Sequence, residues 1–189
     1  MRYFLIIGAV FAVIILLFVL RTPEWKRAGN RGERYARRVV ESVLRPGDRA
    51  FYNVKIAFEG RETELDCVVV NTSGVFIIEV KNYKGRLIGG EEDSEWRKLK
   101  TTRAGKTYEK SVQNPIRQVK RQVYILSHYL TERSARAWVT GYVMLVGGKS
   151  PVKSGFILSS RADVDRAIHR RSDKPLSREQ IEKIAGILG

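Results

Sequence analysis

A run of seven residues, Val75–Lys81, constrains the fold more than any other stretch of the chain. Its β-branched and aromatic residues are typical of a strand buried in a sheet, yet it carries Glu79 and Lys81 two positions apart. Because side chains alternate along a strand, these two charges share one face, and Phe76, Ile78 and Val80 point to the other. Burial of two charges costs several kcal/mol unless they are paired or hold a metal. The sequence therefore predicts a functional site on this strand.

The preceding strand supplies a predicted partner for Glu79. Residues 71–74, Asn-Thr-Ser-Gly, are typical of a hairpin loop between two strands. With Val70 opposite Val75, Asp66 lies directly opposite Glu79 on the same face. Opposed residues have Cβ atoms about 5 Å apart, so two carboxylates there repel each other unless a positive charge lies between them.

A divalent cation with oxygen ligands would satisfy this arrangement, and the backbone carbonyl of Val80 could supply a further oxygen ligand. Lys81 then stands beside the metal-bound water, where it lowers the pKa of the water or orients it toward a phosphodiester. A second interpretation is a cross-strand salt bridge between Glu64 and Lys81, with Asp66 at a strand edge in a shifted register. A lone Glu-x-Lys pattern does not decide between the two.

The N-terminus contains an uncharged run of 18 residues, Tyr3–Leu20. As a helix it spans about 27 Å, close to the hydrocarbon thickness of a bilayer. A cleaved signal peptide is the alternative, but its typical small-x-small site does not follow the run. Basic residues follow within the next turns: Arg21, Lys26, Arg27, Arg31, Arg34, Arg37 and Arg38. This predicts a transmembrane anchor over 3–20, a basic juxtamembrane linker over 21–28, and a cytoplasmic domain over 29–189.

The charge balance indicates a polyanionic partner. The chain has 35 Lys and Arg against 20 Asp and Glu, a net charge of +15, which favours nucleic acid or an anionic membrane surface. The basic segment beside the anchor also suits anionic lipid. A single cysteine, Cys67, excludes an intramolecular disulfide, and two distant histidines match no zinc-ligand spacing.

The hydrophobic pattern predicts a three-layer α/β domain, with a central mixed β-sheet flanked by helices. The helix near the N-terminus, 30–44, has the apolar stripe Tyr35, Ala36, Val39, Val40 and Val43. Later helices are predicted over 115–130, after the N-cap Asn114, and over 177–188, with a capping box. The predicted strands are 50–58, 64–70, 75–81, 96–99, 138–146 and 155–158, and the polar segment 101–113 is predicted to be a loop.

Five short motifs resemble the nuclease-related domain (NERD) family, a member of the PD-(D/E)xK restriction-endonuclease-like superfamily. They occur in order between about Gly29 and Val146: Gly32-Glu33, Glu64-Leu65-Asp66, the stretch Gly74–Gly85, Trp96, and Asn114-Pro115-Ile116-Arg117-Gln118. The resemblance implies a restriction-endonuclease-like fold. The segment from Pro151 matches no motif and is expected to complete the sheet and its helical cover.

The resemblance also implies roles for five residues. Asp66 and Glu79 would hold Mg²⁺ or Mn²⁺, and Lys81 would activate or position the attacking water. Glu33 would approach the metal from the first helix, and Gln118 would face the site from the long helix. Members of the superfamily cut phosphodiester bonds in DNA in this way, and RNA stays open as a substrate.

Two further questions stay open from the sequence. The basic residues of the long helix are either contacts to nucleic-acid phosphates or a solvated face: Arg117, Lys120 and Arg121. Three aromatic residues either stack on bases or pack in the protein: Tyr83, Trp96 and Tyr108. The alternative to a membrane-anchored nuclease is a non-catalytic module, in which the nuclease fold serves as a tethered nucleic-acid-binding or interaction domain.

Overall fold

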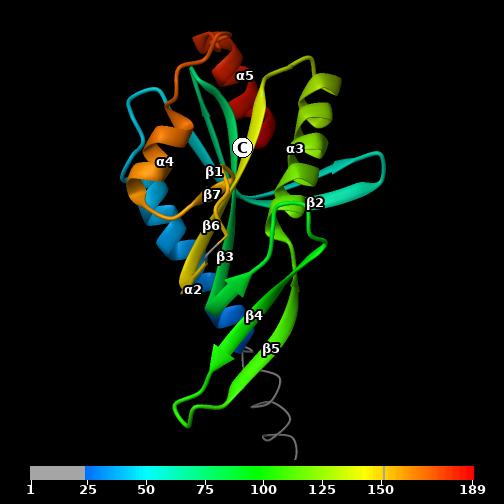
Figure 1. The fold of residues 1–189 in the computed structure, drawn as a ribbon. Coiled ribbons are helices and arrows are strands. Elements are labelled where there is room, and N and C mark those ends of the chain that lie inside the picture. Colours follow the sequence, from blue (N-terminus) through cyan, green and yellow to red (C-terminus); the bar gives the residue numbers. More distant parts are fainter. Residues whose placement is uncertain (1–23, 151) are drawn as a thin grey trace, which may run out of the picture.

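The computed structural model describes residues 24–150 and 152–189, which form a central sheet covered by helices on both faces (Figure 1). The strands are β1 (Arg49–Phe58), β2 (Arg61–Asn71), β3 (Gly74–Ile88), β4 (Glu95–Thr101), β5 (Thr107–Gln113), β6 (Val139–Lys149) and β7 (Ile157–Leu158). The helices are α2 (Glu24–Glu41), α3 (Pro115–Glu132), α4 (Arg161–Ile168) and α5 (Arg178–Leu188). The predicted mixed α/β architecture is therefore confirmed.

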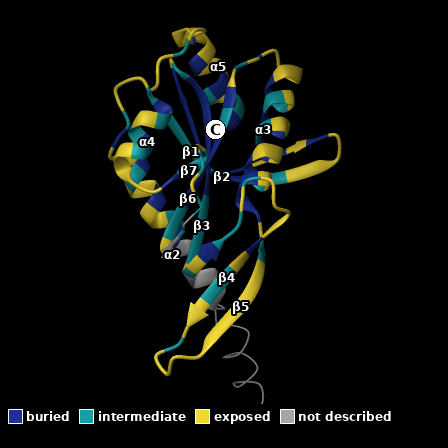
Figure 2. Cartoon of the chain, in the orientation of Figure 1, coloured by how far each residue is buried: buried dark blue, intermediate teal, exposed yellow. Residues whose placement is uncertain are grey.

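The sheet is organised around β3, its longest strand. β3 pairs antiparallel with β2 and then with β4, and parallel with β6 on its other edge. Helices α3 and α5 pack on one face of the sheet, and α2 and α4 pack on the other. Figure 2 shows the buried residues concentrated in the strands between these helices. The segment after residue 151 adds β7 to the sheet and one helix to each face.

The hairpin register matches the prediction. Val70 lies opposite Val75, and Asn71 lies opposite Gly74, so the turn itself consists of Thr72 and Ser73. The Asn71 side chain accepts a hydrogen bond from the Ser73 N–H at 2.8 Å, which is the local bond that favours Asn in such turns. The register thus follows from the apolar alternation and the turn residues together.

The prediction of a loop over 101–113 is wrong, because residues Thr107–Gln113 form β5 and pair with β4 along its whole length. The hydrophobic pattern fails here because most of β5 is exposed on both faces, so no apolar alternation marks it. The strand predicted over 75–81 also continues to Ile88, where it meets β4.

The N-terminal helix differs from its prediction at both the start and the buried face. α2 begins at Glu24, so the predicted linker 21–28 is helical from that residue. Glu24 follows a proline in the sequence, a pattern typical of a first helical turn. Tyr35 is 46% exposed, and the face that packs on the sheet consists of Ala36, Val40 and Val43. Helix α4, capped by Ser160, was not predicted because its eight residues are too few to show a period.

Among the described residues, none of the helices is both long and apolar enough to cross a membrane. The predicted anchor over 3–20 lies outside the described residues.

Gly141 on β6 lets α3 approach the sheet closely. A Cβ at this position would lie 2.7 Å from a methyl group of both Val119 and Val123, and 3.3 Å from the Val119 carbonyl oxygen. Gly141 is paired with Ile77, two residues before Glu79 on β3. The glycine therefore determines how near the side chains of α3 come to the charged part of β3.

Gly141→Ala is expected to destabilise the domain by about 1–3 kcal/mol, because the methyl group overpacks the contact between β6 and α3. Gly186→Ala is the matched control: nothing lies within 4 Å of a Cβ there, and alanine favours the helix α5 by up to about 1 kcal/mol. Denaturant unfolding of the two variants measures both effects. If both substitutions changed the free energy of unfolding equally and in the same direction, the close contact of β6 with α3 at Gly141 would be contradicted.

Candidate functional site around Glu79

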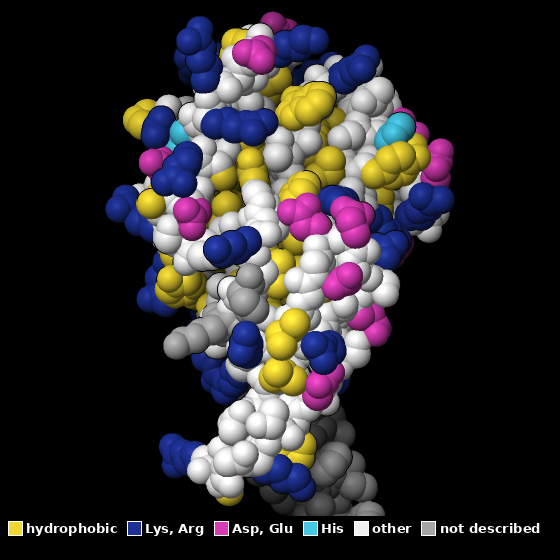
Figure 3. Space-filling model, in the orientation of Figure 1, with side chains coloured by type: hydrophobic (Ala, Val, Ile, Leu, Met, Phe, Trp, Pro, Cys, Tyr) yellow, Lys and Arg dark blue, Asp and Glu magenta, His cyan; other side chains and the backbone are white. Residues whose placement is uncertain are grey.

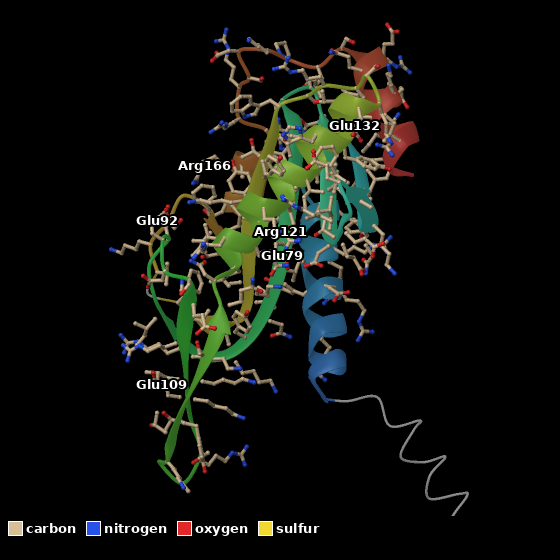
Figure 4. The ribbon with its side chains drawn as sticks, turned by 90° about the vertical axis from the view of Figure 1, so that its right-hand side faces the viewer. Glu79, Glu92, Glu109, Arg121, Glu132 and Arg166 are labelled. Carbon is tan, nitrogen blue, oxygen red and sulfur yellow. The ribbon has the colours of Figure 1, made fainter. Side chains whose placement is uncertain are left out.

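Glu79 lies in the middle of β3 with its carboxylate turned toward α3 (Figure 4). Only 2% of its side chain is exposed, and the carboxylate accepts three hydrogen bonds from other side chains. Oε1 accepts from Lys81 Nζ at 2.5 Å and from Gln118 Nε2 at 2.6 Å. Oε2 accepts from Gln122 Nε2 at 2.6 Å. The buried charge is therefore paired and hydrogen-bonded, which offsets its desolvation.

These contacts decide two of the predictions from the sequence. Glu79 and Lys81 do share a face of β3, and Gln118 does reach that face from α3. The salt bridge weighed between Glu64 and Lys81 is replaced by the bond between Lys81 and Glu79 on the same strand. Glu64 itself is exposed, and only its backbone carbonyl enters the site.

Gln122 is a site residue that the sequence analysis missed. It is only 1% exposed, and its Nε2 donates to Glu79 and to the Glu64 carbonyl oxygen at 3.2 Å. Its Oε1 is buried and has no hydrogen-bond partner among the described residues. The available signal was its position four residues after Gln118, which places both amides on one helix face inside an otherwise apolar stripe.

Gln122→Met is expected to lower the free energy of unfolding by about 1–3 kcal/mol, because one oxygen of a buried carboxylate loses its donor. Methionine keeps the approximate volume and helix propensity of glutamine, so packing changes little. Gln113→Met, at an exposed position of β5, is the control and should leave stability unchanged. Denaturant unfolding measures the difference. A variant at position 122 as stable as the wild type would show that this bond is dispensable.

Asp66 lies where β2 departs from regular pairing. The ladder between β2 and β3 ends with Cys67 opposite Ile78, and Asp66 Oδ2 accepts the Val80 N–H at 2.7 Å. On the other edge of β2, Asn53 of β1 lies between the pairs Tyr52–Cys67 and Val54–Leu65 and has a left-handed φ of 55°. The prediction that Asp66 stands opposite Glu79 on the same face is therefore wrong in orientation, although the register is right.

The irregularity also changes which face each neighbour of Asp66 occupies. Leu65 packs in the core on the α3 side, whereas Cys67 packs on the α2 side. In a regular strand these two residues would share a face. Asp66 lies at this crossover and lines a cavity next to α2, so the carboxylates of Asp66 and Glu79 approach β3 from different sides.

Glu33 reaches the same cavity from α2. The cavity has a volume of about 110 Å³, and its lining includes Glu33, Asp66 and Val80. The preceding residue, Gly32, is buried against β3, and a Cβ there would lie 2.8 Å from the Cβ of Asn82. The Gly32-Glu33 motif thus has a physical reason, because the glycine lets the helix approach β3 closely enough for the glutamate to face Asp66.

The charges of the site act on one another. Burial, together with the negative charges of Glu79 and Glu33, raises the pKa of Asp66 to about 7, against the opposing effects of the Val80 N–H and Lys81. Burial alone would lower the pKa of Lys81, but the charge of Glu79 and the hydrogen bond to it raise that pKa above its ordinary value. Lys81 is therefore a cation at neutral pH and acts as a hydrogen-bond donor.

The donor chemistry of the site fits a hard divalent cation. Within the described part of the chain, no three His, Cys, Asp or Glu side chains lie close enough together to hold a metal ion. Magnesium, however, commonly takes one or two carboxylates and completes its shell with water. Asp66 and Glu79 are two such carboxylates, and the repulsion between them contributes to the raised pKa of Asp66.

Asn114 fixes the start of α3 and hence the position of Gln118. It is fully buried, and its Oδ1 caps the helix by accepting the Ile116 N–H at 2.9 Å. Its Nδ2 donates to three backbone carbonyls of the loop after β3, those of Gly90, Glu91 and Asp93. The Asn-Pro-Ile-Arg-Gln motif therefore ties that loop to the helix one turn before Gln118.

The remaining aromatic and basic candidates differ in their burial and contacts. Trp96 is fully buried, with its indole N–H donating to the Gly90 carbonyl at 2.8 Å, so it is a core residue and does not stack on bases. Lys120 forms an ion pair with Glu92 at 3.1 Å. Arg117 and Arg121 are exposed on α3.

Comparison with known proteins identifies the family. The model of the nuclease-related domain (NERD) family matches residues 28–146. Over 75 residues the chain is 33% identical to an uncharacterized protein of Bacillus anthracis. The aligned segment covers 39% of this chain and 34% of that relative. The chain thus matches about a third of the length of this curated relative, and no solved structure matches it. Because the family model spans more than half of the chain and every residue of the site around Glu79, the chain belongs to the nuclease-related domain family.

Proposed function

We propose that the chain is a metal-dependent nuclease that hydrolyses phosphodiester bonds in DNA, on a restriction-endonuclease-like fold. The observation that carries this proposal is the buried carboxylate of Glu79, held by one cation and two amides on a core strand. Such an arrangement does not improve packing over an apolar side chain, so its presence on a core strand favours a chemical role. Membership of a nuclease-related family supports phosphodiesters as the substrate class.

Asp66 and Glu79 would hold Mg²⁺ or Mn²⁺, with the Val80 carbonyl as a further oxygen ligand and Glu33 nearby on α2. When bound, such an ion supplies charge to the phosphate oxygens and lowers the pKa of a water molecule. Gln118 and Gln122 restrict the Glu79 carboxylate to one orientation, because each donates to a different oxygen. The site is thereby preorganised before the substrate binds.

Lys81 would orient the attacking water and the scissile phosphate. Its side chain is 22% exposed, so the ammonium group is accessible while it holds Glu79. Because its pKa is raised by Glu79, it donates hydrogen bonds and does not remove a proton. In the reaction the water oxygen bonds to phosphorus, the bond from phosphorus to the leaving oxygen breaks, and the proton of the water is released to solvent or to a neighbouring carboxylate.

The direct test is cleavage of DNA by the full chain in neutral detergent, with Mg²⁺ or Mn²⁺ and with EDTA. We expect metal-dependent cutting by the wild type and none by Asp66→Ala. Cleavage that survives unchanged in Asp66→Ala would contradict the proposal, because a contaminating nuclease is insensitive to this substitution.

A second candidate function is a non-catalytic nucleic-acid-binding or interaction module. The observation in its favour is that both oxygens of Glu79 already accept hydrogen bonds from the chain itself. Calorimetric titration with Mg²⁺ and Mn²⁺ separates the two functions. Absence of binding at millimolar metal would favour the module, whereas binding that is lost in Asp66→Ala would favour the nuclease.

We further propose that residues 3–20 anchor the protein in a membrane as a single pass, with the domain on the cytoplasmic side. The support is the uncharged run itself and the excess of Lys and Arg that follows it. Protease protection of membrane vesicles tests the orientation. Digestion of the domain only in inside-out vesicles is expected, and digestion in right-side-out vesicles would contradict it.

A further inference from the structure

The hairpin of β4 and β5, residues 95–113, protrudes from the body of the domain (Figure 1). We call it the β4–β5 arm. Most of its residues are exposed, in contrast to the strands of the central sheet (Figure 2). It carries two glutamates and six basic residues: Arg97, Lys98, Lys100, Arg103, Lys106 and Lys110. In the view of Figure 3, the charged side chains at the protruding end are Lys and Arg.

The pairing of the two strands sorts these charges onto opposite faces. Both glutamates lie on one face, where Glu109 forms an ion pair with Arg97 at 3.6 Å and Glu95 accepts a hydrogen bond from the Ser111 hydroxyl. The other face carries the lysines and no carboxylate. We call it the lysine face, and it consists of Lys98, Lys100, Lys106 and Lys110.

The lysine face is electrostatically unfavourable in the isolated protein. Lys98 lies directly opposite Lys110 across the two strands, and like charges in such a pair are destabilising. Among the described residues neither lysine has an ion-pair partner, and both glutamates of the arm lie on the other face. The segregation of charge therefore indicates an external anion that covers the lysine face.

The lysine face continues the face that carries the catalytic candidates. Lys98 Nζ lies 5.7 Å from the ring centre of Tyr83, which is two residues after Lys81 on β3. Tyr83 packs on the α3 side of the sheet, the side to which Glu79 also points. Farther along the arm, Lys106 Nζ lies 5.3 Å from the ring of Tyr108, which is 51% exposed. A basic surface with two aromatic rings thus leads outward from the site.

We propose that the lysine face of the β4–β5 arm binds the sugar–phosphate backbone of the nucleic acid on which the Glu79 site acts. This inference rests on the proposed nuclease function. The seven residues of β4 extend over about 20 Å, which corresponds to roughly six nucleotides of one strand at 3.4 Å each. The lysines recognise phosphates and not base sequence, so the arm sets where the strand lies relative to Lys81.

An anionic membrane surface is the competing partner for a basic hairpin. The tip of the arm, residues 102–106, would contact a flat bilayer first, because the tip is the end of the hairpin. The three lysines at 98, 100 and 110 instead run along one face of the strands toward Tyr83. A linear polyanion follows such a path and a flat surface does not.

The test is binding of a labelled DNA oligonucleotide of about 30 residues, long enough to cover this footprint, to the full chain in neutral detergent with EDTA, which prevents cleavage. The arm variant is Lys98→Gln, Lys100→Gln and Lys110→Gln together. The control is Lys55→Gln, Lys174→Gln and Lys183→Gln, three exposed lysines outside the arm, so that both triple variants lose the same charge. A third variant replaces the three arm lysines by arginine.

We expect the arm variant to bind at least about tenfold more weakly and its salt dependence to fall by about two to three ion equivalents. The control should lose less than about threefold, and the arginine variant should bind like the wild type, because phosphate contacts need charge and not lysine itself. Equal losses in the arm variant and the control would overturn the inference, since net charge alone would then account for binding.

Two further outcomes separate the arm from the catalytic proposal. DNA binding that depends on the arm, without metal-dependent cleavage by the wild type, would overturn the nuclease function and support the arm as a binding surface. Cleavage by the wild type with unchanged DNA binding in the arm variant would overturn the arm alone. Unchanged DNA binding together with lost retention on phosphatidylserine vesicles would also overturn it, because the arm would then be a membrane contact.

Discussion

Replacement of Glu79 by glutamine is expected to lower the rate of metal-dependent DNA cleavage by roughly a thousandfold. Glutamine keeps the length of the side chain but removes the negative charge that pairs with Lys81 and would hold the cation. The two amides of α3 would then face another amide, and only part of their hydrogen bonding can be retained. Initial cleavage rates of the full chain with saturating Mg²⁺ measure the effect.

Glu64→Gln is the matched control for this substitution. Glu64 is an exposed carboxylate on the neighbouring strand, and its contribution to the site is its backbone carbonyl. Its replacement should change the rate by less than about twofold. Unfolding curves of both variants show whether the protein is still folded at the assay temperature. Equal rates for Glu79→Gln and Glu64→Gln in folded protein would exclude Glu79 from the reaction.

The sequence predicted the central hairpin and the charged face of β3 because local rules govern both. Apolar alternation and an Asn-Thr-Ser-Gly turn specify the pairing of Val70 with Val75. Strand periodicity then places Glu79 and Lys81 on one face. The position of Gln118 followed from the resemblance of its motif, and the cap formed by Asn114 makes that motif structurally consistent.

The remaining features depend on contacts between distant segments. Asp66 faces Asn53 of β1 at a gap in the ladder, and a strand pattern does not predict the left-handed φ of Asn53. Gln122 lies on the same helix face as Gln118 within an apolar stripe, and its contact with Glu79 assigns it to the site. The strand Thr107–Gln113 lacks an apolar face, so pattern reasoning assigns it to a loop. In each case the partner across the fold decides the structure.

Replacement of Asp66 by asparagine is expected to stabilise the metal-free domain at pH 8 by about 2–4 kcal/mol. The pKa of Asp66 is raised from 3.8 to about 7 by burial and by the charges of Glu79 and Glu33. Asparagine is uncharged at every pH, and its side-chain oxygen can still accept the Val80 N–H. The variant therefore removes an unfavourable buried charge and keeps the hydrogen bond.

The sign of the pH dependence follows from proton binding. Between pH 4 and pH 7 the folded wild type holds the Asp66 proton more tightly than the unfolded chain does. The contribution of Asp66 to stability is therefore lost as the pH rises through this window. Asp66→Asn lacks this loss, so the free energies of unfolding of the two proteins should differ by only about 1 kcal/mol at pH 4.5 and diverge further toward pH 8. Denaturant unfolding in EDTA measures the divergence.

The same pair of proteins connects stability with the proposed metal site. A cation held by Asp66 and Glu79 stabilises the folded state by mass action, so Mg²⁺ should raise the stability of the wild type at pH 8. Asp66→Asn should respond less, because one ligand is neutral. Asp173→Asn, at an exposed carboxylate before α5, is the control and should follow the wild type throughout. Parallel curves for wild type and Asp66→Asn from pH 4.5 to pH 8 would contradict the electrostatic account, because Asp66 would then ionise without cost in the folded protein.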